Sequence, residues 1–345
     1  MNFSKFILLL LLVFITCGKT GSGNSDPYFF TLKNWGLTNS QFKSHIDAPD
    51  AWKIEEGSSQ VIVAVIDTGI DYYHPDLKSN LWHDPKNPNQ FGWNFVSDTS
   101  NPHDDHGHGT HIAGIIGAIM DPLMGASGVA HHVSIMSVKY YSDGNPGSVN
   151  LSNTVKAIDY AVEHGAKIIN YSGGGPDFSE SEYVAIKRAE AAGVLFVAAA
   201  GNEHQDSDLI QNYYYPADYI VSNIISVAAT DIENHLLKSS NWGKKNVEVA
   251  APGENIYSTL PGGGFGYMSG TSQATAFVTG LAALLLSKNP KLTPLQLKEI
   301  IIKSVDKIPE LADKVASGGR INAYSALLML QKKCVANKTR SCQYR

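Results

Sequence analysis

The chain has 345 residues, and its 27 Lys and Arg against 32 Asp and Glu give a formal net charge of −5 at pH 7. Positive and negative charges nearly balance and no long basic block occurs. The sequence therefore has no cluster of positive charge that would predict binding to nucleic acid or to an anionic membrane surface. The length exceeds what a small module needs and suits one large α/β domain with surface loops.

Residues 1–17 resemble an export signal that ends on a cysteine. Lys5 gives a positive start, residues 6–15 are all apolar, and Cys17 closes the segment. The apolar run is too short to span a bilayer, so it predicts a signal peptide that is removed or lipidated rather than a membrane helix. Cys17 followed by the polar residues 18–25 is similar to a bacterial lipoprotein acylation site with a flexible tether.

Two locations for the exported protein stay open. An acylated Cys17 would hold the protein in the cell envelope by a lipid anchor, and the sequence predicts no other contact with a membrane. Alternatively, Cys17 lies within a discarded signal and the protein is extracellular. Residues 14–16 are larger than those usual before a lipidated cysteine, which keeps this second location open.

Apolar runs alternate with helical patterns from residue 61 onward. Continuous apolar runs predict strands that are buried on both faces of a parallel sheet. These runs lie at residues 61–66, 133–138, 166–171, 194–199, 224–229 and 247–250. Helices are expected at residues 108–118, 149–164, 179–192, 271–286, 294–304 and 320–331. The predicted fold is α/β, with one domain over residues 26–331, a doubly wound, mostly parallel sheet flanked by helices, and a tail at 332–345.

Polar side chains stand at the carboxyl ends of strands and at helix starts, where such a fold places its chemistry. Asp67 follows the first strand, and Asn202 follows the strand at 194–199. His108 begins one predicted helix, and Ser272 opens another after Gly-Thr. A hydroxyl, an imidazole and a carboxylate are the parts of a nucleophilic triad, in which the histidine is the base and the acid orients it. The asparagine amide and the N-terminus of the serine helix would stabilise an oxyanion.

Other interpretations of these residues compete with the triad. The histidines and aspartates between residues 103 and 111 suggest zinc, but no His-Glu-x-x-His spacing occurs. Asp67-Thr68-Gly69 resembles an aspartic-protease loop, of which the chain has only one copy, so this interpretation requires a dimer. An isolated Gly-Thr-Ser is most often a helix cap. Each fragment is weak alone, and the four together favour the triad.

The order Asp, His, Ser, together with Asn202, resembles the subtilisin family (subtilase) of serine endopeptidases. Other segments match the family in the same order: Asp-Tyr-Tyr-His-Pro-Asp-Leu at 71–77, Asn-Tyr-Ser-Gly-Gly-Gly-Pro at 170–176 and Tyr-Pro-Ala at 215–217. The resemblance covers about residues 26–326. It implies a subtilisin-like fold and hydrolysis of protein or peptide substrates through an acyl-enzyme on Ser272, without a cofactor for catalysis.

The resemblance also implies how substrate binds. Ser172, Gly173 and Gly174 would form a backbone edge that pairs with an extended peptide. Tyr214 would stand near the base of the main specificity pocket and make that pocket shallower.

A structural calcium and a separate partner are further expectations. Asp26 and Asp76 fall where similar enzymes bind calcium, with backbone carbonyls completing the ligands, and the alternative is that either aspartate caps a turn. The catalytic domain is expected to start at Asp26, which leaves no segment for the inhibitory propeptide of many secreted subtilases. Either the enzyme folds unaided, or a separate folding helper or inhibitor is its partner.

The predicted function is serine-type endopeptidase, with two alternatives. A peptide ligase or transpeptidase would use the same acyl-enzyme. An inactive lipoprotein that binds extended peptides belongs to another class, and it gives no chemical reason for the four residues Asp67, His108, Asn202 and Ser272 to occur together.

Overall fold

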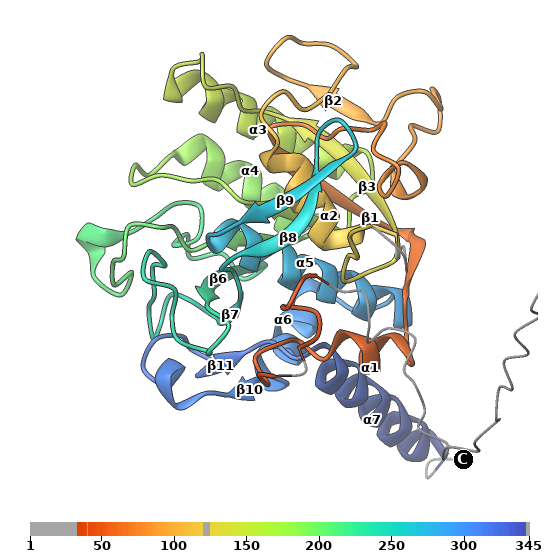
Figure 1. The fold of residues 1–345 in the computed structure, drawn as a ribbon, viewed down its shortest axis with the longest axis vertical. Coiled ribbons are helices and arrows are strands. Elements are labelled where there is room, and N and C mark those ends of the chain that lie inside the picture. The colour runs from red at the N-terminus through yellow and green to blue at the C-terminus, as the bar shows by residue number, and fades with distance from the viewer. Residues whose placement is uncertain (1–32, 40, 120–124, 343–345) are drawn as a thin grey trace, which may run out of the picture.

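The computed structural model of the chain describes residues 33–39, 41–119 and 125–342, and side chains as far as residue 332. The predicted signal, the tether, Cys17 and Asp26 lie outside the described residues. Figure 1 shows the described part as one body around a central sheet. No helix in these ranges is both long enough and apolar enough to cross a membrane.

The central sheet has nine strands in the order β10-β11-β7-β6-β5-β4-β1-β3-β2. Neighbouring strands pair in parallel except β10 with β11. The strands are β1 Gly57–Asp67, β2 Gly92–Asn94, β3 His132–Lys139, β4 Ile168–Tyr171, β5 Leu195–Ala199, β6 Ile224–Thr230, β7 Val249–Pro252, β10 Asp306–Lys307 and β11 Gly319–Arg320. Because strand order runs outward from β1 in both directions, the carboxyl ends of β1 and β4 form a switch point where such sheets bind ligands.

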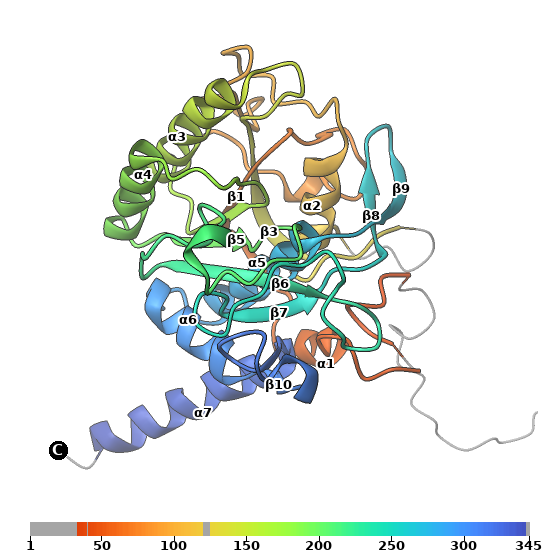
Figure 2. The same cartoon turned by 90° about the vertical axis from the view of Figure 1, so that its left-hand side faces the viewer.

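Helices cover both faces of the sheet. Val63 and Val65 of β1 belong to one core, with helices α2 His108–Gly117 and α5 Thr271–Lys288. Ala64 and Ile66, which point to the opposite face, belong to a second core, with α3 Gly147–Glu163 and α4 Glu180–Ala191. Figure 2 shows α3 and α4 on the side of the sheet opposite α6 and α7. This double cover explains the continuous apolar runs, and it confirms the predicted doubly wound α/β fold.

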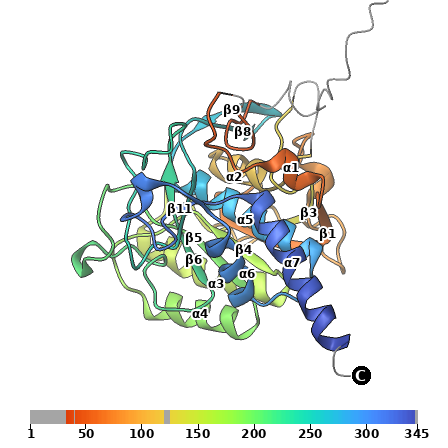
Figure 3. The ribbon, with the colours of Figure 1, turned by 90° about the horizontal axis from the view of Figure 1, so that it is seen from below.

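The remaining elements close the edges of this arrangement. A hairpin of β8 Ile256–Leu260 and β9 Gly264–Met268 lies on α2, where Gly114 is essential because a Cβ there would be 2.2 Å from Thr259 Oγ1. Figure 3 shows helix α1 beside α7. The other helices are α1 Ala48–Trp52, α6 Pro294–Lys303, α7 Ala323–Cys342 and the short 3₁₀ turns η1 Lys78–Asn80, η2 Ile210–Asn212 and η3 Pro309–Leu311.

Element boundaries differ from the sequence prediction in the last third of the chain. The strand expected at 247–250 is β7 Val249–Pro252, because Val249 pairs with Val227 of β6. The helix expected to start at residue 320 starts at Ala323, since the backbone of Arg320 first pairs with β7. Helix α7 then continues to Cys342 instead of ending at residue 331.

Candidate active site

Asp67 and His108 meet at the carboxyl edge of the sheet. Asp67 is the last residue of β1 and is 4% exposed, and His108 is the first residue of α2. The distance from His108 Nδ1 to Asp67 Oδ1 is 2.8 Å. A carboxylate can only accept, so Nδ1 carries the proton that this bond shares and Nε2 is the nitrogen left to act as a base. The structure thus brings together two of the predicted residues in the predicted orientation.

The buried carboxylate of Asp104 fixes the start of α2, a role that is not among those predicted above for this aspartate. Asp104 Oδ1 accepts from the N–H of His106 and of Gly107, each at 2.9 Å. Its Oδ2 accepts from Thr110 N at 3.0 Å and from Thr110 Oγ1 at 2.6 Å. Burial works to raise the pKa of Asp104, but these hydrogen bonds lower it below the usual range. An aspartate shortly before a helix start is the signal that favours such capping.

The carboxylates around His108 decide its charge. Burial by itself lowers the pKa of the imidazole, but the charge and hydrogen bond of Asp67 and the charge of Asp104 outweigh it and leave the pKa raised above 6.5. The side chain of His108 is 23% exposed, so a reacting group can approach it.

Ser272 lies on the first turn of α5, which packs against both α2 and β1. Ser272 as a whole residue is 8% exposed. Its Oγ donates to the carbonyl of Ser172 at 3.1 Å. Within the described residues no hydrogen bond joins Ser272 to His108. A hydroxyl turns about a single χ1 bond, and catalytic hydrogen bonds often form only in the substrate complex.

Asn202 is exposed beyond the end of β5 and contacts the same helix start. Its Oδ1 accepts from Thr271 N at 2.9 Å and from Thr271 Oγ1 at 3.2 Å. Because a backbone N–H can only donate, the amide oxygen must face Thr271, and Nδ2 is directed away from it. The amide oxygen of Asn202 thus contacts the residue before Ser272, and the amide nitrogen takes no part in that contact.

The two glycines of the predicted substrate edge, Gly173 and Gly174, have no room for side chains. A Cβ on Gly173 would lie 2.2 Å from the Tyr140 hydroxyl, and one on Gly174 would lie 2.4 Å from Tyr214 Cε1. Ser172 ties the edge to the nucleophile helix, since its Oγ donates to the carbonyl of Ser272 at 3.2 Å. The backbone is therefore bare where an extended peptide would pair with it.

Tyr214 packs beside this edge, and its place at the base of a specificity pocket stays a prediction. Its half-buried ring lies between Gly174 and Gly201, where added Cβ atoms would be 2.4 Å and 3.0 Å from it. Burial and the charge of Glu203 raise the pKa of Tyr214 to about 12, so the ring carries a neutral hydroxyl at physiological pH.

Residues 58–324 match the model of the subtilase family (Peptidase_S8). The chain belongs to the subtilase family. It is 37% identical to thermitase of Thermoactinomyces vulgaris over 303 residues, which are 88% of this chain and 98% of thermitase. It is 38% identical to subtilisin E of Bacillus subtilis (strain 168) over 257 residues, which are 74% of this chain and 63% of that relative.

Solved structures agree with this membership. A protease of Pseudoalteromonas arctica PAMC 21717 superposes with a TM-score of 0.73 at 25% identity, over 86% of this chain and 97% of that one. A lanthipeptide protease superposes with a TM-score of 0.70 at 27% identity, over 82% of this chain and 92% of that one. The chain is thus a subtilase serine endopeptidase, with the predicted single-domain fold.

In this subtilase the histidines near the site have separate partners. His111 Nε2 lies 3.0 Å from the carbonyl of Ile256 beneath the hairpin, and burial lowers the pKa of His111 to about 4. His103 Nε2 instead lies 3.6 Å from Asp71 Oδ1. Over the described residues, no group of three or more His, Cys, Asp and Glu side chains gathers to hold a metal ion. The zinc interpretation has no support in these contacts.

Asp76 of the subtilase is buried and hydrogen-bonded to the backbone. It is 4% exposed, and its Oδ2 accepts from the N–H of Ala126 at 2.9 Å. Its predicted calcium partner, Asp26, lies outside the described residues, so the calcium site stays a prediction.

Proposed function

We propose that this subtilase hydrolyses peptide bonds through an acyl-enzyme on Ser272, with His108 as the general base, Asp67 as the residue that orients it and Asn202 as an oxyanion donor. The observation that carries the proposal is the 2.8 Å contact of His108 Nδ1 with Asp67 Oδ1, at the sheet edge where α5 presents Ser272. Membership in a family of serine endopeptidases supports the same chemistry.

The proposed reaction proceeds by two proton transfers through one imidazole nitrogen. Ser272 Oγ bonds to the carbonyl carbon of the substrate while His108 Nε2 takes the hydroxyl proton. The carbonyl oxygen becomes negative and accepts hydrogen bonds from Asn202 Nδ2 and from the free N–H of Ser272 in the first turn of α5. His108 then gives its proton to the leaving amine, and water repeats the sequence to release the acid.

The substrate in this proposal is a protein or peptide in extended form. Its backbone pairs with residues 172–174, where Gly173 and Gly174 have no side chains to keep another strand away. Tyr214, packed on Gly174, narrows the space for the side chain next to the scissile bond.

Loss of the oxyanion donor should mainly lower kcat. We expect Asn202→Asp, which keeps an acceptor for the Thr271 N–H but lacks the amide donor, to lower kcat about 10²- to 10³-fold, the size known for the donor of subtilisin. KM should change little, because the oxyanion exists only in the transition state. Steady-state kinetics on a peptide amide checks this, and an unchanged kcat would remove Asn202 from the oxyanion site.

An active-site fluorophosphonate tests the function directly. It should label the wild-type protein on Ser272, identified by mass spectrometry of the labelled peptide. Absence of labelling in folded protein would instead favour the alternative of an inactive peptide-binding protein. Products formed with added amine nucleophiles distinguish hydrolysis from ligation or transpeptidation.

We also infer an exported protein with a lipid anchor on Cys17, from the signal-like residues 1–17 and the polar residues 18–25. The mature N-terminal peptide is then expected to begin with an acylated Cys17 and to partition into the membrane fraction. Mass spectrometry of that peptide checks this, and an unmodified start between residues 18 and 26 would indicate free secretion.

Calcium and a separate partner belong to the same proposal. Asp26 and the buried Asp76 would supply carboxylate oxygens, which calcium prefers, and the ion would stabilise the fold without taking part in the reaction. A separate protein that helps folding or inhibits the enzyme rests on the sequence alone.

A further inference from the structure

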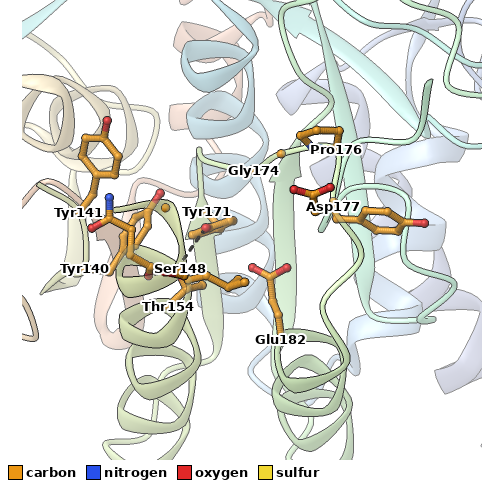
Figure 4. A pocket seen from close by; sticks show the side chains of 14 residues that line it. Tyr140, Tyr141, Ser148, Thr154, Tyr171, Gly174, Pro176, Asp177 and Glu182 are labelled. Carbon is orange, nitrogen blue, oxygen red and sulfur yellow. Dashed lines mark hydrogen bonds between the residues drawn. The ribbon is translucent and has the colours of Figure 1, made fainter. Parts of the chain in front are cut away.

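A cavity of about 420 Å³ opens beside the substrate edge, and Glu182 lies at its floor. Its walls come from the end of the edge, at Gly174 and Gly175, and from Tyr140, Tyr171 and the start of α3. Figure 4 shows the carboxyl of Glu182 pointing from its helix toward the part of the cavity where Tyr171 and Asp177 lie. A buried carboxyl at the base of a substrate-side cavity calls for a physical explanation.

Glu182 is not used to cap its own helix. The segment Ser179-Glu180-Ser181-Glu182 has the capping-box pattern, in which the glutamate would accept from the N–H of Ser179. That N–H instead donates to the hydroxyl of Tyr219 at 3.0 Å. Glu182 Oε2 lies 2.9 Å from the same hydroxyl, and among the described residues Oε1 has no hydrogen-bond partner. One carboxyl oxygen therefore remains available to a ligand in the cavity.

Among the described residues, no positive charge lines the cavity to compensate Glu182. The lining residues in this part of the chain include a second acid, Asp177, but no lysine, arginine or histidine. The titratable groups that face Glu182 from the neighbouring elements are hydroxyls, on Tyr140, Tyr171 and Tyr219. Glu182 is 3% exposed, and burial raises its pKa to about 7 against a lowering by the Tyr219 hydrogen bond. A positive charge brought into the cavity would stabilise the carboxylate.

The distance along the substrate edge tells which part of a peptide reaches the cavity. Ser172 contacts Ser272, and the cavity begins at Gly174 and Gly175. An extended backbone from Ser172 to Gly175 covers about 10 Å, which is the length of about three substrate residues. A side chain about two to four residues from the scissile bond would therefore enter the cavity.

We propose that Glu182 selects peptide substrates with a lysine or arginine at that position, by pairing its carboxylate with the cationic end of the side chain. The inference rests on the proposed endopeptidase function and adds its substrate class. The long apolar stem of a lysine suits the tyrosine walls, while its ammonium group reaches the acid at the floor. A neutral side chain of the same length would pack against the same tyrosine walls but would leave the Glu182 carboxylate without a charged partner.

The test compares matched peptides. Quenched fluorescent peptides carry either lysine or norleucine at each position from two to four residues away from the cleaved bond, on either side. At one position we expect kcat/KM at pH 8 to favour lysine about tenfold or more, since close buried charge pairs are strongly favourable. Glu182→Gln should bring that ratio close to one. Glu180→Gln, an exposed change on the same helix, should leave it unchanged.

The pH dependence of the ratio separates a direct contact from a structural role. Lysine stays charged between pH 6 and 8, whereas a carboxyl with a pKa of about 7 goes from mostly neutral to mostly charged. The lysine-to-norleucine ratio of the wild type should therefore rise about tenfold over this range. The titration of His108 affects both peptides alike and cancels in the ratio.

Each outcome decides between the two proposals. A pH-independent ratio near one at every position, in a protein that cleaves both peptides and reacts with a fluorophosphonate, overturns the role of Glu182 and leaves the proposed function intact. No cleavage and no labelling of folded protein overturns the proposed function itself. If Glu182→Gln fails to fold, the pH profile of the wild-type ratio alone decides.

Discussion

Replacing Ser272 by alanine is expected to lower kcat for peptide hydrolysis about 10⁶-fold, the size found for the nucleophile of subtilisin. Alanine has no oxygen to bond to the substrate carbonyl, so the acyl-enzyme cannot form. Substrate should still bind, because residues 172–174 and Asn202 are unchanged. Hydrolysis of a peptide amide and reaction with a fluorophosphonate measure the effect, and both should be lost together.

A second serine on the same helix provides the control for this variant. Ser287 lies in the last turn of α5, where its Oγ donates to the carbonyl of Ala283 at 2.8 Å. Ser287→Ala should keep full activity. If purified Ser272→Ala kept proteolysis comparable to that of Ser287→Ala, the nucleophile would have to be another residue.

Replacing Asp67 by asparagine is expected to lower kcat about 10⁴-fold, as in other serine proteases with this triad. The buried carboxylate accepts from His108 Nδ1 at 2.8 Å and so leaves Nε2 unprotonated toward the substrate. An asparagine amide can instead donate to Nδ1, which stabilises the wrong tautomer and leaves no charge to balance the imidazolium. The exposed Asp50 on α1 offers a matched control, because Asp50→Asn should retain activity.

The pH profile of kcat/KM is a second test of the Asp67→Asn variant, because it reports the pKa of the catalytic base. The pKa of His108 is raised above 6.5, and only neutral imidazole can act as a base, so wild-type activity should fall as the pH drops through a value above 6.5. Asp67→Asn removes the main cause of the raised pKa, so its acid limb should move to lower pH while its maximum falls. The attraction between Asp67 and charged His108 also stabilises the folded protein, with a pH dependence opposite to that of activity. This contribution to the free energy of unfolding is fully present below pH 6.5 and is lost as the pH rises through the pKa of His108 in the folded protein. If the acid limb of Asp67→Asn stayed at the wild-type pH, Asp67 would not be the residue that raises the pKa of the catalytic base.

Much of the fold and of the proposed chemistry could be predicted because the deciding signals are local. A run such as residues 61–66 is apolar at every position, and this pattern suits only a strand covered on both faces. Once the strands are parallel, their carboxyl ends share one edge of the sheet, so Asp67 and Asn202 fall on the same side. The resemblance of short segments supplied the separate substrate-side roles expected of Gly174 and Tyr214.

The fold class, the family and the residues expected to react follow from local sequence patterns. The partner that each polar group takes depends instead on which distant segments folding brings next to it. Thr293 and Gln296 form the capping box that their spacing favours, since no distant group intervenes. Ser179 and Glu182 have the same spacing, but Tyr219 from a remote loop takes the N–H of Ser179. Distant hydrogen bonds compete with local ones at similar energy, so folding alone directs Glu182 toward the cavity.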